Sequence, residues 1–518
     1  MKLNWKLRSL CILSGGLAGL AFSSLYLGWL MWFALIPFFY VLYSHELKAG
    51  FGFKCGFWFG ISFYLVLIHW LLYLHPLTWL GFSVVESLII LGGGWIAISI
   101  LEGFGIWLFG LALGYFKPSG WQRILIPAIF WLIMEWLQGF GELSLPWGRL
   151  VVSQFQYTPL LQISAVTGSM FISALIVAFN AAVACCLVDW VKFSKYVQTK
   201  NILSLMAVTL IVFFIFISGL NSLKNFHTDN QRTIPVTLVQ GNFSQSEKWS
   251  GGSLGIMLNT YLNLTQNSSN TQPKLVIWPE SAVPVFLKYY WPVKNELVKL
   301  AVVYNLYLLT GIFDAPSPTS NTYYNGATVI DNKGKILGWY YKRHLVPFGE
   351  YLPFRGVLDF LFGKLSWMNA IKHDIEPGTD ASPFVLPFGN VGTLICFESV
   401  YPDVARENVL AGAEMLAIIT NDGWYKDSIA AYQHNAQAVL RAIENGRDIV
   451  RAANTGITSI IDYQGRILKQ TELLKREYIT GNVTFRSDMT FYTKYGDWLV
   501  YLGILLILPL FLYNRKGR

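Results

Sequence analysis

The chain has 518 residues, of which 54% are hydrophobic and only 13% are charged. Because soluble globular domains carry roughly a quarter charged residues, this composition excludes an ordinary soluble protein. The formal net charge of +9 is held largely by short loops between apolar segments, so it gives no indication of nucleic-acid binding.

The apolar residues are gathered in the first 222 positions and again near the C-terminus. About 20 apolar residues cross a bilayer as a helix, so the sequence predicts a polytopic α-helical membrane protein with about eight transmembrane helices. We expect a seven-helix region over residues 1–222 and a C-terminal helix within 496–514. For the shortest span, a re-entrant or buried helix is the alternative. A cleaved signal peptide is not expected, because the first span leads directly into others. The spans are Leu10–Leu25, Gly28–Tyr43, Cys55–Leu74, Glu86–Phe116, Ile124–Leu137, Leu161–Trp190, Ile202–Leu220 and Trp498–Tyr513.

Basic residues predict how these spans are oriented. With a cytoplasmic N-terminus, the outer connections among the first seven spans contain only Arg149. This asymmetry follows the positive-inside rule, so both termini are expected in the cytoplasm and residues 227–488 outside it. The cytoplasmic segments then hold Lys2, Lys6, Arg8, Lys48, Lys54, Lys117, Arg123, Lys192, Lys195, Lys200, Arg515, Lys516 and Arg518.

Residues 227–488 alternate between short β-rich runs and segments with helical spacing. Such alternation predicts an α/β sheet layered with helices. The expected strands lie at 234–240, 274–280, 306–313, 322–331, 335–342, 392–398, 414–421 and 457–465, and the expected helices at 254–267, 293–305, 401–411 and 429–445.

This outer domain contains a single cysteine, Cys396, in "LICFES". In an oxidising compartment, a thiol without a partner in its own domain is either a buried apolar residue or a reactive group, and the cysteine count alone leaves both open. The other cysteines, which lie in or beside predicted spans, are expected to be small apolar residues: Cys11, Cys55, Cys185 and Cys186.

Two further ionisable residues follow predicted strands of the same domain, Glu280 in "VIWPES" and Lys342 in "WYYKRH". Side chains at strand ends converge on a crevice in α/β folds. A lysine near a thiol favours the thiolate, and a carboxylate in reach accepts the thiol proton. The three residues together predict acyl transfer through a thioester, without a metal or another cofactor.

The order "VIWPES", "YYKRHLVPFGEYLP", "LICFES" resembles the Glu-Lys-Cys signature of the nitrilase superfamily of carbon-nitrogen hydrolases, which implies an α-β-β-α sandwich. With spans before and after that domain, the whole chain resembles the membrane-bound branch of this superfamily, the apolipoprotein N-acyltransferases. "VQGNFSQSEKW", "TNDGWY", "RAANTG" and "EWLQGFGELSLPWG" add to the resemblance.

The resemblance implies a role for each matching residue. Cys396 is the expected nucleophile, Glu280 the general base and Lys342 the group that stabilises the tetrahedral intermediate. Glu350 and Glu398 are expected to support this arrangement. The expected substrate-binding residues are Trp249 and Phe397, the latter standing where many relatives carry tyrosine.

The implied reaction has two steps. A phospholipid donates an acyl chain to the cysteine, and the α-amino group of an apolipoprotein's N-terminal diacylglyceryl-cysteine then accepts it. The expected location is the bacterial inner membrane, with the catalytic domain in the periplasm, and a monomer is expected. A membrane-tethered amidase and a non-enzymatic scaffold are the alternatives. The retention of Glu280, Lys342, Glu350 and Cys396 argues against the scaffold.

Two apolar, aromatic stretches, 285–292 and 352–371, are either core helices or arms that dip into the membrane interface. Two acids in predicted spans also need an explanation, because a charge within a bilayer is costly. We expect Glu135 at the outer surface and Glu102 in a structural hydrogen bond with a neighbouring helix.

Overall fold

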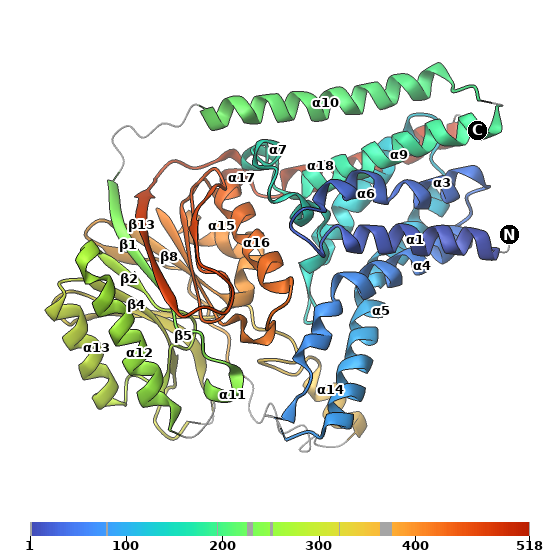
Figure 1. The fold of residues 1–518 in the computed structure, drawn as a ribbon. Helices are drawn as coiled ribbons and strands as arrows, with labels where there is room; N and C mark the ends of the chain where they lie inside the picture. The colour runs from blue at the N-terminus through green and yellow to red at the C-terminus, as the bar shows by residue number, and fades with distance from the viewer. Residues whose placement is uncertain are drawn as a thin grey trace.

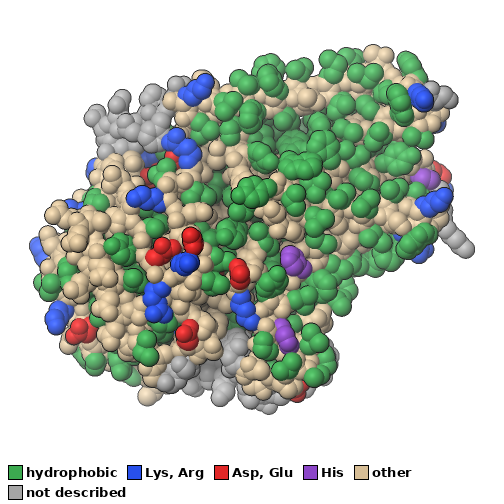
Figure 2. Space-filling model, in the orientation of Figure 1, with side chains coloured by type: hydrophobic (Ala, Val, Ile, Leu, Met, Phe, Trp, Pro, Cys, Tyr) green, Lys and Arg blue, Asp and Glu red, His purple; other side chains and the backbone are tan. Residues whose placement is uncertain are grey.

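The computed structural model describes residues 3–78, 81–193, 195–224, 232–248, 252–320, 322–362 and 375–516. A bundle of apolar helices forms one part of the molecule, and an α/β domain forms the other (Figure 1). Hydrophobic side chains cover the visible surface of the helical part, whereas charged side chains are frequent over the α/β domain (Figure 2). The division predicted from composition is therefore present.

Four of the described helices are long and apolar enough to cross a membrane, namely α4, α5, α9 and α10. Shorter apolar helical stretches cover Gly28–Ser44 and Trp498–Tyr513. The helical part consists of α1 (Trp5–Leu20), η1 (Gly28–Leu30), α2 (Met31–Ala34), α3 (Ile36–Ser44), α4 (Ala49–Leu67), η2 (His69–Leu74), α5 (Val84–Phe116), α6 (Gln122–Leu137), η4 (Pro146–Gly148), η5 (Leu150–Gln154), α7 (Thr158–Leu161), α8 (Ser164–Thr167), α9 (Met170–Lys192), α10 (Thr199–Lys224) and α18 (Trp498–Lys516).

The second, third and sixth predicted spans are interrupted in the structure, and the third changes at Ile68 from α4 to the 3-10 helix η2. The second breaks at Leu35, just before Pro37 enters the first turn of α3, because a proline is tolerated there but not inside a helix. The sixth breaks at Gly168, whose φ of 76° lies in the left-handed region, and its long helix begins only at Met170.

Glycines allow α4 to pack directly on α5. Gly52, Gly56 and Gly60 recur at every fourth position, so they lie on one face of α4. A Cβ atom on Gly56 would overlap the carbonyl oxygen of Ile106, and one on Gly52 would overlap that of Gly110. Small residues at four-residue spacing are the usual means of bringing membrane helices into backbone contact.

The α/β domain contains two sheets with helices on both outer faces. The first sheet has seven strands in the order β13-β1-β2-β4-β5-β6, with β3 on β4, and the second has six in the order β12-β11-β10-β9-β8-β7. Their strands are β1 (Arg232–Gln240), β2 (Leu275–Ile277), β3 (Val283–Phe286), β4 (Tyr307–Asp314), β5 (Tyr324–Ile330), β6 (Ile336–Tyr341), β7 (Phe384–Leu386), β8 (Gly389–Ile395), β9 (Met415–Thr420), β10 (Ile449–Ala453), β11 (Ser459–Ile461), β12 (Ile467–Gln470) and β13 (Glu477–Phe485).

Three apolar layers hold this sandwich together. Val236 and Ile395 belong to the layer between the sheets. Leu297 of α13 belongs to the layer that covers the first sheet, together with residues of α12. Val404 of α15 and Val439 of α16 cover the second sheet. This α-β-β-α order is the predicted one. The helices are α11 (Gln245–Lys248), α12 (Ser253–Ser268), α13 (Trp291–Val303), α14 (Arg355–Phe362), α15 (Pro402–Leu410), α16 (Ala430–Asn445) and α17 (Phe491–Tyr495).

The layer over the second sheet continues into the helical bundle, because one buried cluster contains residues of both parts. Buried hydrogen bonds cross the same boundary. Trp147 Nε1 donates to Gln433 Oε1 at 2.7 Å, and the hydroxyls of Ser144 and Tyr401 lie 2.7 Å apart. Helix α16 of the α/β domain is thus packed between a sheet and the helical bundle (Figure 1).

Substituting Gly56 with leucine should separate α4 from α5. Forcing a side chain into a packed contact costs about 1–3 kcal/mol or more, so we expect a clear fall in thermal stability and in the yield of folded protein in detergent. Gly50→Leu is the matched control, since a Cβ there has nothing within 4 Å. Equal stability of the two variants would contradict this packing.

Candidate active site

Each residue of the predicted trio follows a strand. Glu280 comes three residues after β2, Lys342 directly after β6, and Cys396 directly after β8. The first two strands belong to one sheet and β8 to the other, so the site lies where the two sheets end together. Cys396 has a φ of 54°, in the left-handed region that non-glycine residues rarely adopt. Strain of this kind is concentrated at functional sites.

A buried ammonium group links two carboxylates at the centre of the site. Lys342 is 1% exposed, and its Nζ lies 2.8 Å from Glu350 Oε2 and 3.7 Å from Glu280 Oε1. Burial lowers the pKa of Lys342, but Glu350 and Glu280 raise it by more, so the pKa ends well above its ordinary value. The ammonium group therefore stays charged at every physiological pH.

Amide groups hold the two carboxylates in place. Asn325 Nδ2 donates to Glu280 Oε1 at 2.7 Å and to Glu350 Oε1 at 3.0 Å. The backbone N–H of Asn421 donates to the other Glu280 oxygen at 2.8 Å. These bonds leave the Glu280 side chain little rotational freedom, as a positioned proton acceptor requires.

Glu398 joins the Lys342 loop to the turn that carries Cys396. It is fully buried. Its Oε2 accepts the N–H of Ile395 at 2.7 Å, and its Oε1 accepts the N–H of Arg343 at 2.6 Å. The neighbours of Lys342 and Cys396 are therefore bonded to one carboxylate, which fixes the separation of the two loops.

The charges of Glu280 and Lys342 both change the pKa of the Cys396 thiol. Burial raises the pKa of Cys396 most, Glu280 raises it further, and Lys342 lowers it. The net pKa lies well above the ordinary value, so the resting thiol keeps its proton at neutral pH. A nucleophile in this state needs a base at the moment of attack.

Sequence reasoning missed a second cluster directly behind Cys396. His434 Nε2 donates to the Cys396 carbonyl oxygen at 3.1 Å, and its Nδ1 lies 2.9 Å from Asp422 Oδ1. Arg451 Nη2 donates to the other Asp422 oxygen at 2.6 Å. Burial raises the pKa of Asp422, but Arg451 and His434 lower it by more, to well below its usual range. A buried ionic cluster thus supports the strained turn.

Lys248 was also missed, although it lies within the quoted "SQSEKW". It is 3% exposed, and its Nζ donates to the Glu280 carbonyl oxygen at 3.3 Å. Burial lowers the pKa of Lys248 to about 8, against the opposing effects of Glu280 and Cys396. The only indication in the sequence that Lys248 belongs to the site was its position in a motif. Because most lysines are solvated surface charges, that indication was not enough to predict it.

Of the two residues expected to bind substrate, the structure describes Phe397 but not Trp249. Trp249 lies outside the described residues. The Phe397 ring is buried and stacks on Trp147 of the helical part, with centroids 6.3 Å apart. That contact ties the Cys396 turn to the bundle, and a role for Phe397 in substrate binding stays a prediction.

The expected surface position of Glu135 is wrong. Its side chain is 1% exposed, and Oε1 accepts the N–H of Leu150 at 2.8 Å and Nε1–H of Trp131 at 2.9 Å. The carboxylate joins α6 to η5, because the backbone of η5 folds back against the end of α6 and brings donors to it.

Asp422→Asn should destabilise the protein and slow acylation of Cys396. The change leaves Arg451 as a buried cation without a full counter-charge, which costs about 3–5 kcal/mol. Because the pKa of Asp422 is depressed, its contribution to stability is present above about pH 4 and lost only at lower pH. The stability difference from wild type, measured by thermal unfolding, should stay constant between pH 6 and pH 8. Asp427→Asn, a substitution of an exposed residue in the same loop, is the control. If the Asp422→Asn and Asp427→Asn proteins were equally stable, Asp422 would not be a stabilising counter-charge for Arg451.

Comparison with known proteins agrees with the geometry. The carbon-nitrogen hydrolase family matches residues 236–487, and the apolipoprotein N-acyltransferase N-terminal domain matches residues 14–182. The α/β domain is therefore nitrilase-like. A solved amidase from Nesterenkonia sp. shares 17% identity with a TM-score of 0.39, covering 52% of this chain and 96% of its own.

Curated relatives match over nearly the whole length. The apolipoprotein N-acyltransferase of Geobacter metallireducens is 28% identical over 98% of this chain and 95% of its own. That of Gloeobacter violaceus is 30% identical over 96% of this chain and 92% of its own. With both domains matched and the Glu-Lys-Cys residues gathered at one site, the chain belongs to the apolipoprotein N-acyltransferase family.

Proposed function

We propose that the reaction of this chain runs through Cys396, with Glu280 as the general base and Lys342 as the stabilising cation. The chain is an acyltransferase that moves an acyl chain from a phospholipid to the α-amino group of an apolipoprotein's N-terminal diacylglyceryl-cysteine. The observation that carries the residue roles is the buried Lys342 between Glu280 and Glu350, within electrostatic reach of the thiol.

In the first step, Glu280 takes the proton from Cys396 Sγ while the sulfur attacks the ester carbonyl carbon of the phospholipid. The oxyanion that forms is stabilised by the ammonium group of Lys342. When the tetrahedral intermediate collapses, the carbon–oxygen bond of the ester breaks. Glu280 returns the proton to the departing glycerol oxygen, which leaves a thioester and a lysophospholipid.

In the second step, the α-amine of the lipoprotein attacks the thioester carbonyl carbon, and Glu280 takes a proton from the nitrogen. Collapse of the second intermediate breaks the carbon–sulfur bond, and the proton returns to Cys396. The products are an amide and the free thiol. Glu350 and Glu398 act as positioning residues, because one binds the ammonium group and the other binds the loop backbones.

The orientation in the membrane is part of the proposal. We place eight spans within residues 1–222 and 496–514, the catalytic domain 227–488 in the periplasm, and both termini in the cytoplasm of a bacterial inner membrane. The distribution of Lys and Arg supports this orientation. Figure 1 adds support, because the N- and C-terminal ends lie at the same end of the bundle, remote from the α/β domain. We propose that a monomer is the working unit.

The aromatic arms 285–292 and 352–371 complete the proposal. Phe360 is 86% exposed and Trp291 is 62% exposed. The second arm is bound to the helical part, since the N–H of Phe354 donates to Glu142 Oε2 at 2.6 Å. Exposed rings held beside a bilayer favour its interface, where they would shield the thioester from water. Residues 363–371 of the second arm lie outside the described residues.

The acyl-enzyme gives the primary test. Incubated with phospholipid, the purified protein should carry a hydroxylamine-sensitive acyl adduct on the tryptic peptide of Cys396, measured by mass spectrometry. Cys396→Ala should carry none, and Glu280→Gln should form it about 10²-fold or more slowly, as loss of a general base predicts. Cys186→Ala and the exposed Glu296→Gln are the matched controls. An adduct on another residue would overturn the assignment.

The arms are tested separately. Replacing Phe360 and Trp291 with serine should reduce turnover of vesicle-embedded phospholipid about 10²-fold or more, because burying each large apolar side chain contributes about 1.5–3 kcal/mol and two are removed, while thermal stability is retained. Val385→Ser, an exposed apolar site on β7, is the control. Unchanged turnover would leave the arms without this role.

A further inference from the structure

A pocket lies in the helical part, and Cys396 is not among the residues that line it. It has a volume of about 390 Å³ and is enclosed by α5 and α6, with Ile507 of α18. Several large apolar side chains at its border are substantially exposed, so the pocket opens on the outer surface of the helical bundle. These side chains are Leu101, Phe104, Leu108, Leu137 and Phe140.

The pocket is polar at one end and apolar along the rest of its length. Glu102, Gln138 and Ser144 line the polar end. Ala112 and Phe130 line the other. Glu102 and Ala112 are ten residues apart on α5, so the pocket extends about 15 Å along the helix. These are the proportions of one acyl chain with a small polar head.

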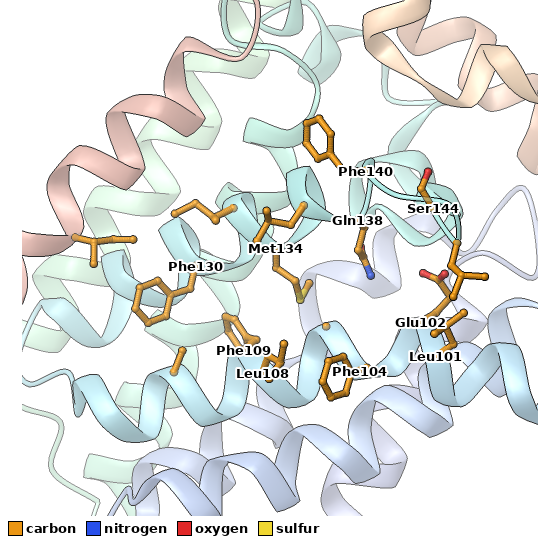
Figure 3. Close-up of a pocket in the computed structure, with 16 residues that line it drawn as sticks. Leu101, Glu102, Phe104, Leu108, Phe109, Phe130, Met134, Gln138, Phe140 and Ser144 are labelled. Atoms are coloured by element: carbon orange, nitrogen blue, oxygen red, sulfur yellow. The ribbon is translucent and has the colours of Figure 1, made fainter. Parts of the chain in front are cut away.

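Glu102 is the feature that points to a ligand. It is 6% exposed and its side chain lines the pocket (Figure 3). Among the described residues, its carboxyl group has no hydrogen-bond or ion-pair partner, so the expected bond to a neighbouring helix is wrong. Buried polar groups without partners are rare in folded proteins and indicate a missing ligand, ion or water.

The polar end is also close to the catalytic domain. Gln138 Nε2 donates to the Tyr64 hydroxyl at 2.9 Å, which fixes the amide at the rim. Ser144 is bonded to Tyr401, whose ring packs edge-on against Phe397, the neighbour of the nucleophile. A lipid head at Glu102 therefore lies beside the same boundary that carries the Cys396 turn.

We infer that this pocket binds a single-chain lipid with a free glycerol hydroxyl, the chemistry of the lysophospholipid that the first step releases. The hydroxyl would form a hydrogen bond with the Glu102 carboxyl group, and the chain would lie along α5 toward Ile507. The volume is small for a diacyl phospholipid and falls within the range of small-ligand sites. This inference rests on the proposed function for the origin of the lipid, but the site itself does not depend on it.

The test uses full-chain Cys396→Ala protein, which cannot react, and a lysophosphatidylethanolamine with a photoactivatable chain. We expect saturable crosslinking to peptides of α5 and α6. Monoacylglycerol should compete with the probe, because both have one acyl chain and a free glycerol hydroxyl. Since monoacylglycerol has no phosphate, its competition would show that the phosphate head group is not what the pocket recognises. Equal competition by diacyl phosphatidylethanolamine would overturn the proposal, because it would show an unselective lipid surface.

Variants locate the site. Gly105→Leu should lower the affinity for the photoactivatable lysophosphatidylethanolamine about tenfold or more. A Cβ atom at this position points between Met134 and Gln138 at ordinary contact distance, so the rest of the leucine side chain would enter the pocket. Gly93→Leu, on the same helix with nothing within 4 Å, should bind as wild type. Glu102→Leu should lower the affinity for the same lipid about tenfold, as expected for the loss of one hydrogen bond, and Glu102→Gln should retain binding.

The lipid-binding proposal and the catalytic proposal can fail independently of each other. With Cys396 intact, Gly105→Leu should form the acyl-enzyme at the wild-type rate, since the pocket lies outside the reacting groups. If Gly105→Leu and Glu102→Leu both bind the probe as wild type does, the inference fails. If wild-type protein forms no adduct on Cys396, the catalytic proposal fails whatever the pocket binds.

Discussion

The structure depends on one buried cation. Lys342 is enclosed beside Glu280 and Glu350, and each charge makes the burial of the others tolerable. Removing a partner from such a cluster costs about 3–5 kcal/mol, because it leaves an uncompensated charge away from water. The loops after β2 and β6 therefore cannot separate without exposing or neutralising these groups. In the proposed mechanism the same constraint serves the chemistry, since a cation that is fixed and poorly hydrated stabilises a developing oxyanion strongly.

The position of the catalytic domain on the bundle follows from shared packing. The second sheet is covered by α15 and α16, whose outer faces join the apolar core of the membrane helices. His434 of α16 binds the Cys396 carbonyl, while Trp147 of the helical part binds Gln433 beside it. The turn that carries Cys396, the proposed nucleophile, is thus held by the helical part. This arrangement suits an enzyme whose donor and acceptor are both anchored in lipid, because it keeps the thiol at a fixed height above them.

Much of the site was predictable from local sequence. Glu280, Lys342 and Cys396 each end a β-rich run, and the ends of neighbouring strands meet. His434 was not predictable, because its approach to Cys396 depends on how α16 packs against the second sheet. Strand β13 was missed for a similar reason, since it pairs with β1 from the far end of the domain. The surface position predicted for Glu135 was wrong because hydropathy locates the end of α6 but does not show that η5 folds back against it and buries the carboxylate.

The geometry of the acyl-enzyme tests the central claim most directly. A structure of the full chain, determined with an acyl group on Cys396, would show where the thioester carbonyl oxygen lies. The account predicts that this oxygen is within about 3 Å of Lys342 Nζ, with Glu280 beside the sulfur, as a preorganised oxyanion site requires. A carbonyl oxygen directed away from Lys342, with the ammonium group still enclosed by its two carboxylates, would contradict it.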